Sequence, residues 1–188
     1  MNYKLYNVKY NLKENYSIIC SQIDTSIFIY LGFDFFKELI KKKILYIYNI
    51  KSKKKISAII TVVEFKNYKT INKETFYYLI KNPIILIKSI IYLIKSLNKK
   101  INFNINKKYL YLLHLVIFKK EFSNVTIKNK DLIINRFYKK ILKKHKANTI
   151  FLNFKKDNYK ANKYYKRNNF HIFYKTKGLI FLKKKFNI

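Results

Sequence analysis

The segment that most constrains the fold of this chain is residues 147–170, ANTIFLNFKKDNYKANKYYKRNNF. It opens with a short apolar run, Thr149 to Phe154, which is bounded by charge and is typical of a strand buried on both faces of a sheet. A polar turn, residues 155–158, follows the run. Four residues then recur at helical spacing, namely Ala161, Tyr164, Tyr165 and Asn168. Because Phe170 opens another apolar run, the segment predicts a strand, a turn, a short helix and a strand.

Four positions in this segment match the pattern N-x-x-A-x-x-x-Y-x-x-x-G-F at fixed offsets: Asn158, Ala161, Tyr165 and Phe170. The pattern resembles the signature that closes the acetyl-coenzyme-A core of the GNAT acetyltransferase superfamily. Asn169 stands where that family usually has glycine, and asparagine tolerates the left-handed backbone conformation better than other non-glycine residues. The alternative is that a strand, turn and helix of any α/β domain shows this spacing by chance.

The resemblance implies an α/β (α+β) fold, with a mixed, mostly antiparallel central sheet flanked by helices and a helical insert between the third and fourth strands. A chain of 188 residues is long enough for one domain with a hydrophobic core and too short for two of ordinary size. We therefore expect a single acetyltransferase-like domain over residues 1–188, with the helical insert at 66–108 and the acetyl-CoA core at 109–170.

The chain is strongly basic, with 42 Lys and Arg against 9 Asp and Glu and a formal net charge of +33. Such a charge suggests a polyanionic partner such as nucleic acid. However, the lysines are spread along the whole chain, and Gly, Pro and Trp are scarce, as expected of a very AT-rich coding genome. We take codon bias as the main cause, so nucleic acid is a possible partner that is not favoured. The surface should still attract phosphates, including those of coenzyme A.

Cysteine and histidine usage excludes two kinds of site. Cys20 is the single cysteine, so neither an intramolecular disulfide nor a cysteine-based zinc site can form. The histidines, at 114, 145 and 171, show no metal-ligand spacing, and no metal is predicted. The N-terminal residues contain no apolar signal-peptide core, so we expect a cytoplasmic protein.

The first third of the chain predicts one strand, two helices and a hairpin. Residues 3–10 alternate as a strand does, whereas Glu14–Gln22 and the segment after Gly32 have helical patterns. Two β-branched and aromatic runs, Ile44–Ile50 and Ile56–Phe65, are joined by a polar turn and predict a hairpin. This order is similar to the N-terminal half of a GNAT fold.

Residues 66–108 are longer than the tight turn that a compact GNAT core has at this point. A helix is predicted over Lys73–Lys81, and Pro83 opens an amphipathic helix over 83–99 with a lysine stripe beside an isoleucine stripe. Three interpretations are open: this helix packs on the core, forms a lid over the acceptor substrate, or lies on an anionic membrane surface. It is too short and too often interrupted by lysine to span a bilayer, so no transmembrane segment is expected.

Two apolar runs are the expected fourth and fifth strands, Tyr109–Phe118 and Thr149–Phe154. The resemblance implies that the fourth strand bulges and separates from the fifth, which exposes backbone groups that bind the pantetheine arm. Val116, Ile117 and Phe118 are the residues predicted to supply these groups. The final residues, 170–186, predict two strands that turn at Gly178, with lysines that protect the sheet edge from further pairing.

Between those two strands the family has a pyrophosphate loop, Q/R-x-x-G-x-G/A, at the start of a long helix. Backbone N–H groups and the helix dipole bind a diphosphate there, and glycines allow a close approach. The corresponding residues here are Ser123, Asn124, Thr126, Ile127, Lys128, Asn129 and Lys130. Thr126 and Lys128 occupy the glycine positions. Either these residues still allow the turn, with the lysines adding charge, or coenzyme binding is weakened or lost.

Acyl transfer to an amine needs a held thioester, a deprotonated amine and a proton for the departing thiolate. By resemblance Tyr165 is the acid, with Tyr164 as the alternative if the helix register differs; a tyrosine simply packed on the sheet would give the same pattern. Asn158 either binds the pantetheine or caps the helix, and capping alone explains an asparagine there.

The general base is a second open assignment. His114 in the fourth strand has a usable pKa, although a lone histidine in an apolar strand can equally be a hydrogen-bonded core residue. Glu64, Glu121 and water are the other candidates.

The sequence therefore predicts an acyltransferase that uses acetyl-CoA and acts on an amine, or less readily a hydroxyl, of a small molecule or sugar. Two rivals remain, a non-catalytic basic protein that binds nucleic acid and a catalytically inactive GNAT relative. No RNP-like, helix-turn-helix or zinc motif supports the first rival. The sequence carries no indication of the oligomeric state.

Overall fold

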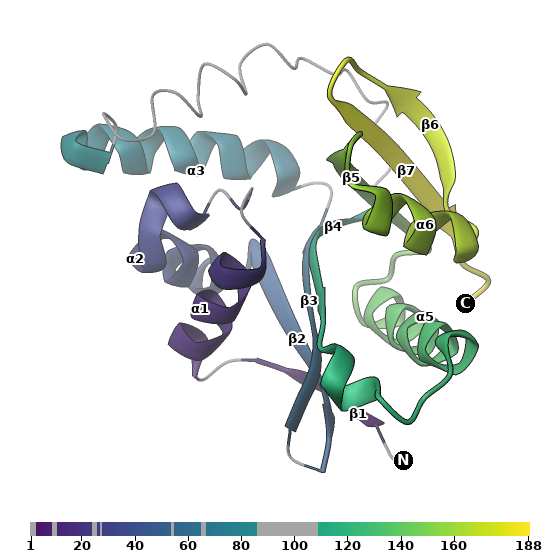
Figure 1. Cartoon of the computed structure of the whole chain (residues 1–188). Helices are drawn as coiled ribbons and strands as arrows, with labels where there is room; N and C mark the ends of the chain where they lie inside the picture. The colour runs from purple at the N-terminus through teal and green to yellow at the C-terminus, as the bar shows by residue number, and fades with distance from the viewer. Residues whose placement is uncertain are drawn as a thin grey trace.

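The computed structural model describes residues 3–8, 11–23, 26, 28–53, 55–64, 67–85 and 109–188. Its centre is a seven-stranded sheet with the strand order β1-β2-β3-β4-β5-β7-β6 (Figure 1). The pair β4–β5 is parallel, and the other neighbouring pairs are antiparallel. A mixed, mostly antiparallel sheet flanked by helices is the predicted fold class, which is confirmed.

The elements before the insert follow the predicted order. They are β1 (Tyr3–Asn7), α1 (Leu12–Gln22), α2 (Phe28–Lys41), β2 (Leu45–Ser52) and β3 (Lys55–Glu64). The helix predicted after Gly32 is the second part of α2. Gly32 has φ 82° and ψ 174°, so it kinks α2 and joins it to a helical turn that begins at Phe28.

The insert begins with a helix, α3 (Tyr68–Lys81), that starts five residues before the predicted Lys73. The ring of Tyr78 lies 4.9 Å from that of Phe35, and the Glu74 carboxylate lies 2.6 Å from Nζ of Lys42, so α3 packs on α2. Residues 83–85 are also helical. The predicted amphipathic helix over 83–99, with its lid and membrane interpretations, otherwise lies outside the described residues.

The second part of the chain also has the predicted order. Its elements are β4 (Tyr109–Ile117), the 3₁₀ helix η2 (Lys119–Phe122), α5 (Ile127–Lys144), β5 (Thr149–Lys155), α6 (Tyr159–Arg167), β6 (His171–Lys175) and β7 (Leu179–Lys185). Asn169 has φ 57°, so the residue at the family's glycine position adopts the left-handed conformation that asparagine tolerates. The β6–β7 hairpin turns around Gly178, with Thr176 N–H donating to the Leu179 carbonyl at 2.9 Å.

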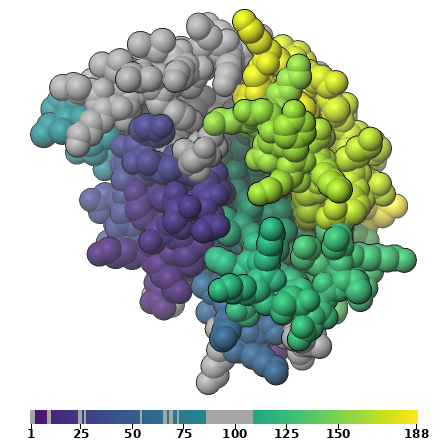
Figure 2. Space-filling model, viewed as in Figure 1, coloured from purple at the N-terminus to yellow at the C-terminus, as the bar shows by residue number. Residues whose placement is uncertain are grey.

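The sheet has a hydrophobic cluster on each face. On one face α5 and α6 cover residues such as Ile60, Leu112 and Leu152. On the other, α1 and α2 cover residues such as Ile59 and Val63. Alternate residues of β3 belong to opposite clusters, as the two-residue period of a strand requires. Figure 2 shows the N-terminal helices in purple beside the green and yellow second part, with residues of β4 visible between them.

Candidate active site

The strand β4 is paired unequally on its two sides. Towards β3 the ladder runs along almost its whole length, from Leu110 opposite Glu64 to Ile117 opposite Ala58. Towards β5 it comprises three pairs, at Tyr109, Leu110 and Tyr111 of β4. Residues 112–117 of β4 and 152–155 of β5 therefore have no ladder between them, and the two strands separate. This is the separation that the resemblance implied, and it is confirmed.

A β-bulge lies where β4 leaves β5. Thr61 of β3 faces His114, whereas the next residue, Val62, faces Leu112, so Leu113 is the extra residue in β4. A bulge bends its strand and increases the local twist, which turns the following residues away from the original ladder. The bulge expected in the fourth strand is therefore present.

The open end of β4 holds the three residues predicted to bind a pantetheine arm. Val116 and Ile117 face Ile59 and Ala58 of β3. In an antiparallel pair successive residues direct their backbone groups to opposite sides, so one of the two presents its N–H and carbonyl to the opening. The Phe118 N–H donates to the Ser57 carbonyl at 3.0 Å, so it is committed to β3.

The N-terminus of α5 follows this open end and carries unbonded N–H groups. Thr126 is the N-cap, and its Oγ1 accepts from the Asn129 N–H at 3.3 Å. Within the described part of the chain, the backbone N–H groups of Thr126, Ile127 and Lys128 donate no hydrogen bond. The side chains of these three residues are exposed. Free N–H groups, the positive end of the helix dipole and the Lys128 ammonium together suit an anion such as a diphosphate.

The absence of glycine from this loop has a structural explanation. Thr126 has φ −59°, and among the described residues positive φ values occur at Gly32 and at five residues outside 123–128. The loop therefore reaches the helix without the left-handed conformation that would require glycine. The sequence left two consequences open: polar residues still allow the turn, or coenzyme binding is weakened or lost. The backbone conformation supports the first.

Tyr165 is held by aromatic rings on the α5 and α6 side of the sheet. Its ring lies 5.7 Å from that of Phe154 and 5.1 Å from those of Tyr164 and Phe170. Burial raises the pKa of Tyr165 well above its usual value, so its hydroxyl stays protonated at neutral pH. No hydrogen bond from this hydroxyl is formed within the described residues.

Tyr164, the alternative acid, is less suited to the role. Its hydroxyl oxygen is fully buried and has no hydrogen-bond partner in the part of the chain that the structure describes. Burial raises its pKa above the usual range as well. The choice between Tyr165 and Tyr164 as the acid stays a prediction.

The neighbouring Asn158 has the structural role that the sequence left open. It is the N-cap of α6, and its Oδ1 accepts from the Ala161 N–H at 2.9 Å. Ala161 is partly buried against the cluster under α5 and α6. Asn158 and Ala161, which both match the pattern, therefore fix the start and the packing of α6, the helix that carries Tyr165.

His114 lies on the other face of the sheet, buried between β3 and α2. Its Nδ1 is 2.8 Å from Oγ1 of Thr61, and its ring lies 5.6 Å from that of Phe28, on α2. It is 5% exposed, and burial lowers its pKa to about 3. These are the properties of a hydrogen-bonded core histidine. A group of this pKa is a weak base towards an ammonium ion, and the structure does not bring His114 into the cluster that holds Tyr165.

The two candidate carboxylates occupy different ends of β4. Glu64 lies opposite Leu110, at the closed end, and its Oε1 accepts from Nδ1 of His145 at 2.9 Å. The Nε2 of His145 is in turn 2.7 Å from the Tyr48 hydroxyl, so Glu64 belongs to a structural network. Glu121 is in η2, directly after the open end of β4. Of the two carboxylates, Glu121 is therefore the one that adjoins the open end of β4, where a general base would be needed.

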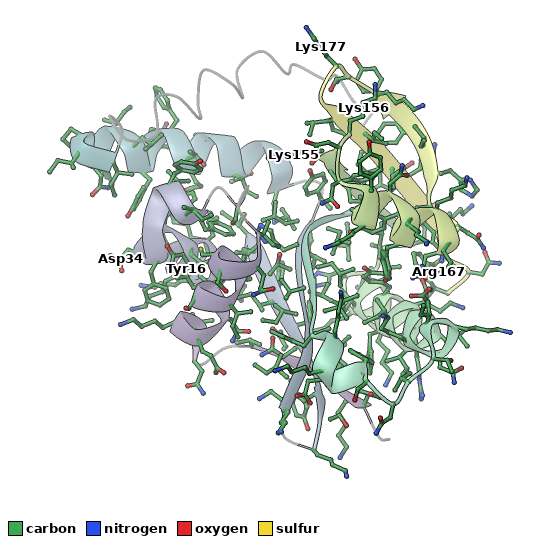
Figure 3. All side chains as sticks on the ribbon, viewed as in Figure 1. Tyr16, Asp34, Lys155, Lys156, Arg167 and Lys177 are labelled. Carbon is green, nitrogen blue, oxygen red and sulfur yellow. The ribbon has the colours of Figure 1, made fainter. Side chains whose placement is uncertain are left out.

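A polar clamp between α5 and α6 was not anticipated from the sequence. Arg167 donates through Nε and Nη2 to both carboxylate oxygens of Asp131, which is buried in the first turns of α5. Figure 3 shows Arg167 at the end of α6 that approaches α5. The clamp ties the helix that carries Tyr165 to the helix that carries the free N–H groups.

Three further polar residues extend this clamp. Nδ2 of Asn135 donates to Oδ1 of Asn168 at 2.6 Å, and Nζ of Lys184 donates to the Asn168 carbonyl at 2.7 Å. A compositional signal existed, because Arg167 is one of two arginines among 42 basic residues. Its partner could not be read from the sequence, since 36 residues separate the two.

Comparisons by sequence find no relative. No protein-family model matches the chain. No curated protein matches it either. Among the described residues, no helix is both long enough and apolar enough to cross a membrane.

Comparisons by structure find many solved proteins with the same fold. The N-acetyltransferase PseH of Campylobacter jejuni, solved with acetyl coenzyme A, is 18% identical over 98% of this chain and 99% of its own, with a TM-score of 0.56. NAA60 of Arabidopsis thaliana, also solved with acetyl-CoA, is 11% identical over 98% of each chain, with a TM-score of 0.57.

An acetyltransferase of Bacillus subtilis, solved with CoA, is 10% identical over 99% of this chain and all of its own, with a TM-score of 0.54. At these identities the likeness establishes a shared fold. That fold is the one found in acetyltransferases of the GNAT family, one of which is named as such among the similar structures, from Listeria monocytogenes.

Proposed function

We propose that this chain, which has the fold of the GNAT acetyltransferases, transfers an acetyl group from acetyl-CoA to an amine of a small molecule or sugar. The observation that carries the proposal is the separation of β4 from β5 beyond Tyr111 and Phe151. It leaves backbone groups of β4 unpaired beside a helix N-terminus with free N–H groups. In a thioester with a diphosphate at its far end, the amide-containing arm matches the unpaired backbone groups of β4, and the diphosphate charge matches the free N–H groups of α5.

The residues of the loop fit the diphosphate of acetyl-CoA. The N–H groups of Thr126, Ile127 and Lys128 would hold it, with the Lys128 ammonium as the nearest added charge. The open edge of β4 at Val116 and Ile117 would hold the pantetheine arm. When bound, acetyl-CoA supplies an acetyl group that is already activated as a thioester. That three similar structures were solved with acetyl-CoA or CoA supports this assignment.

The reaction needs two proton transfers that this chain must accommodate. The neutral amine attacks the thioester carbonyl, so the new C–N bond forms as the C–S bond breaks, and the amine proton passes to water. Tyr165 donates a hydrogen bond and then its proton to the departing thiolate, and solvent reprotonates it. Tyr165 is protonated at neutral pH, since its ordinary pKa is already near 10, and burial raises that pKa further and makes the hydroxyl a weaker acid than a free tyrosine. His114, with its lowered pKa, is left out of this assignment.

The acceptor is proposed to be an amine of a small molecule or sugar. An amine acceptor is supported by the names of similar structures, which include N-acetyltransferases. The small-molecule or sugar nature of the acceptor, the single domain over residues 1–188 and the cytoplasmic location remain predictions from the sequence.

The test is thermal unfolding with and without acetyl-CoA at modest ionic strength. Ligand at about 100 times its Kd should stabilise the folded state by about 2.7 kcal/mol, which raises Tm by roughly 5–10 °C in a chain of this size. Thiol release should follow when amines are added.

Two other outcomes would identify the rival functions. A shift with acetyl-CoA but no thiol release with any amine would indicate an inactive relative. No shift with millimolar acetyl-CoA, together with oligonucleotide affinity that falls steeply with salt, would replace the proposal by nucleic-acid binding.

A further inference from the structure

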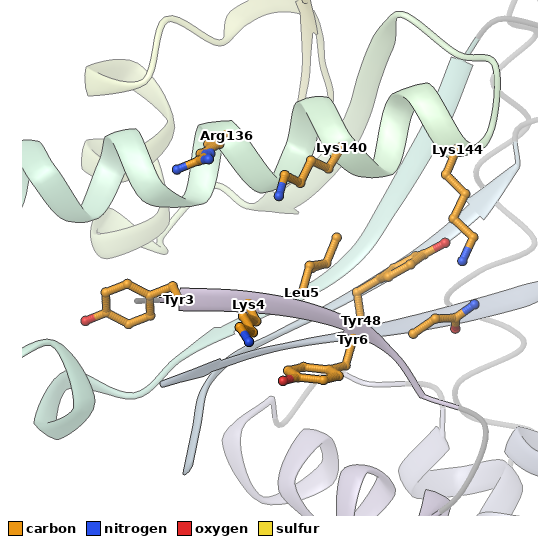
Figure 4. A pocket seen from close by; sticks show the side chains of 9 residues that line it. Tyr3, Lys4, Leu5, Tyr6, Tyr48, Arg136, Lys140 and Lys144 are labelled. Atoms are coloured by element: carbon orange, nitrogen blue, oxygen red, sulfur yellow. The ribbon is translucent and has the colours of Figure 1, made fainter. Parts of the chain in front are cut away.

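A groove apart from the candidate active site lies between the outer edge of β1 and the flank of α5. It has a volume of about 510 Å³ (Figure 4). Two strands, β2 and β3, separate β1 from β4, so at about 4.8 Å per strand this groove is roughly 14 Å from the opening at β4. What it binds is therefore a question separate from the proposed acetyl transfer.

The roof of the groove is a stripe of three cations on α5. Arg136, Lys140 and Lys144 are spaced four residues apart, which places them on one side of the helix. Figure 4 shows all three extending from the side of α5 that faces β1. All three are exposed, and none has an acidic partner among the described residues. Their charge is therefore available to an anionic ligand.

The floor of the groove is the outer edge of β1. In the described part of the chain β1 pairs with β2 and with no other segment, so it is the terminal strand of the sheet. Tyr3 and Leu5 of β1 are partly buried against the cluster under α5. At residues 4–7 this outer edge has backbone N–H and carbonyl groups without strand partners in the described part of the chain, which is a template for one more strand.

The spacing of the cations matches the spacing of a strand. Four helical residues advance the axis by about 6 Å, which is the separation expected between Arg136 and Lys140 and again between Lys140 and Lys144. Two residues of a strand advance it by about 6.6 Å. A strand laid along β1 would thus place every second side chain beneath the next cation of the stripe.

Two of the three tyrosines that line the groove do not favour nucleic acid as the occupant, and the third, Tyr6, is 46% exposed but projects from the side of β1 away from α5 (Figure 4). Tyr48 is 1% exposed, and its hydroxyl is 2.7 Å from Nε2 of His145. The ring of Tyr3 is already stacked on Phe122, with centroids 5.1 Å apart and an interplanar angle of 11°. Single-stranded nucleic acid needs free aromatic faces on which bases stack, whereas an added strand needs backbone groups and matched charges.

We propose that this groove binds an extended acidic peptide as an additional strand beside β1. Acidic side chains at alternate positions of the peptide lie beneath Arg136, Lys140 and Lys144. Backbone hydrogen bonds to β1 supply part of the affinity, and the three charges select the sequence.

The test uses fluorescein-labelled heptapeptides and the whole protein at low ionic strength. One peptide carries three glutamates at alternate positions, and its isomer carries the same three glutamates in a row. A third has the alternating sequence with methylated backbone nitrogens on one edge. The alternating peptide should bind at least about tenfold more tightly than either of the others, which is a difference that one lost charged contact can cause. Hydrogen exchange at residues 3–7 should slow when it binds.

A matched pair of variants separates the groove from the overall charge. Lys140→Glu with Lys144→Glu removes two cations of the stripe and should weaken binding by at least about tenfold. Lys139→Glu with Lys143→Glu makes the same change of charge at the adjacent exposed positions of α5. This variant should change the affinity for the alternating peptide by less than about threefold. Because all four side chains are exposed, both variants should fold.

Three results would overturn the proposal. Equal weakening by the two variants would show that binding follows net charge alone. Equal binding of the isomer or of the methylated peptide would exclude strand addition. An oligonucleotide that protects residues 3–7 and displaces the alternating peptide would assign the groove to nucleic acid.

Discussion

The two sides of β4 differ in how they are closed. Towards β3 there are seven residue pairs, and towards β5 there are three. The strand β5 is itself paired along its length with β7, from Thr149 to Lys155. The sheet therefore consists of two well-paired units that meet at three positions. Both β3 and β5 are apolar runs, so hydrophobic pattern alone did not decide which side of β4 stays open.

The open side is bridged by side chains rather than by a strand ladder. The helix α5 follows β4, α6 follows β5, and the Asp131–Arg167 clamp joins the two helices. Such an arrangement keeps the two units in register while leaving backbone groups free for a ligand. Five predictions test this contrast between the closed side and the open side.

The largest effect is expected at Tyr165. Tyr165→Phe should lower the rate of acetyl-CoA-dependent thiol release by about 10²–10⁴-fold, because it removes the proton donor for the thiolate. Its KM for acetyl-CoA should change little. Steady-state kinetics with an accepted amine measures both values.

The adjacent tyrosine supplies the control. Tyr164→Phe removes a fully buried hydroxyl without a partner in the described residues, so the rate should stay within about threefold and the stability should not fall. Similar rate losses in the two variants would mean that neither hydroxyl acts as the acid.

The clamp should have the next largest effect. Asp131→Ala should lower the free energy of unfolding by about 1–3 kcal/mol, because it leaves the Arg167 guanidinium without its partner. Arg167→Lys keeps the charge but loses the bidentate geometry, and its cost should be smaller because the Arg167 side chain is 38% exposed. Urea unfolding of both variants measures the difference. If Asp131→Ala is as stable as the unchanged protein, the two helices are held together by their apolar contacts alone.

The phosphate loop should have a moderate effect on cofactor affinity. Lys128→Glu should weaken acetyl-CoA binding by about tenfold, since it puts a negative charge beside the free N–H groups. Lys139→Glu, on the same helix but three turns away, makes the same change of charge as a control and should alter the Kd by less than about twofold. Isothermal titration at one ionic strength compares the two. Equal losses would place the diphosphate elsewhere.

The smallest effect at neutral pH is expected at His114, on the closed side of β4. His114→Gln should leave the rate within about threefold, because the buried ring is already neutral and bonded to Thr61. A loss of more than a hundredfold with an unchanged fold would restore His114 as the base.

The pH dependence of stability gives His114 a separate signature. Its pKa falls from 6.5 to about 3 on folding. Unfolded chains therefore bind more protons between these values, and the stability contributed at higher pH is lost as the pH falls from 6.5 towards 3. The slope is at most about 1.4 kcal/mol per pH unit for one such group. Urea midpoints at several pH values should show a shallower slope in His114→Gln.

Much of the fold could be predicted because its signals are local. The alternation in residues 3–7, the helical period of α5 and the apolar run of β5 each reflect contacts within one element. The starts of α2 and α3 were less predictable. The start of α2 lies in an apolar segment before Gly32, and the start of α3 lies in a mixed segment. In both, packing on other elements decides how far the helix extends.

The candidate site could be predicted only in part. The position of Tyr165 followed from a motif with fixed offsets, whereas the start of α5 followed from its place between two expected strands, because the glycines of the family's loop are missing. The burial of His114 and the partner of Glu64 did not, because residues 53 and 81 positions apart in the chain meet there. The same is true of the groove, where β1 meets α5.

By itself the sequence determined the order of strands and helices, the cap of α6 at Asn158 and the left-handed turn at Asn169, since each depends on residues a few positions apart. Only the tertiary structure decided which side of β4 stays open, which histidine loses its basicity and which basic side chains of α5 face the outer edge of β1. These properties depend on pairing partners and on exclusion of water, and both arise when distant segments of the chain pack together.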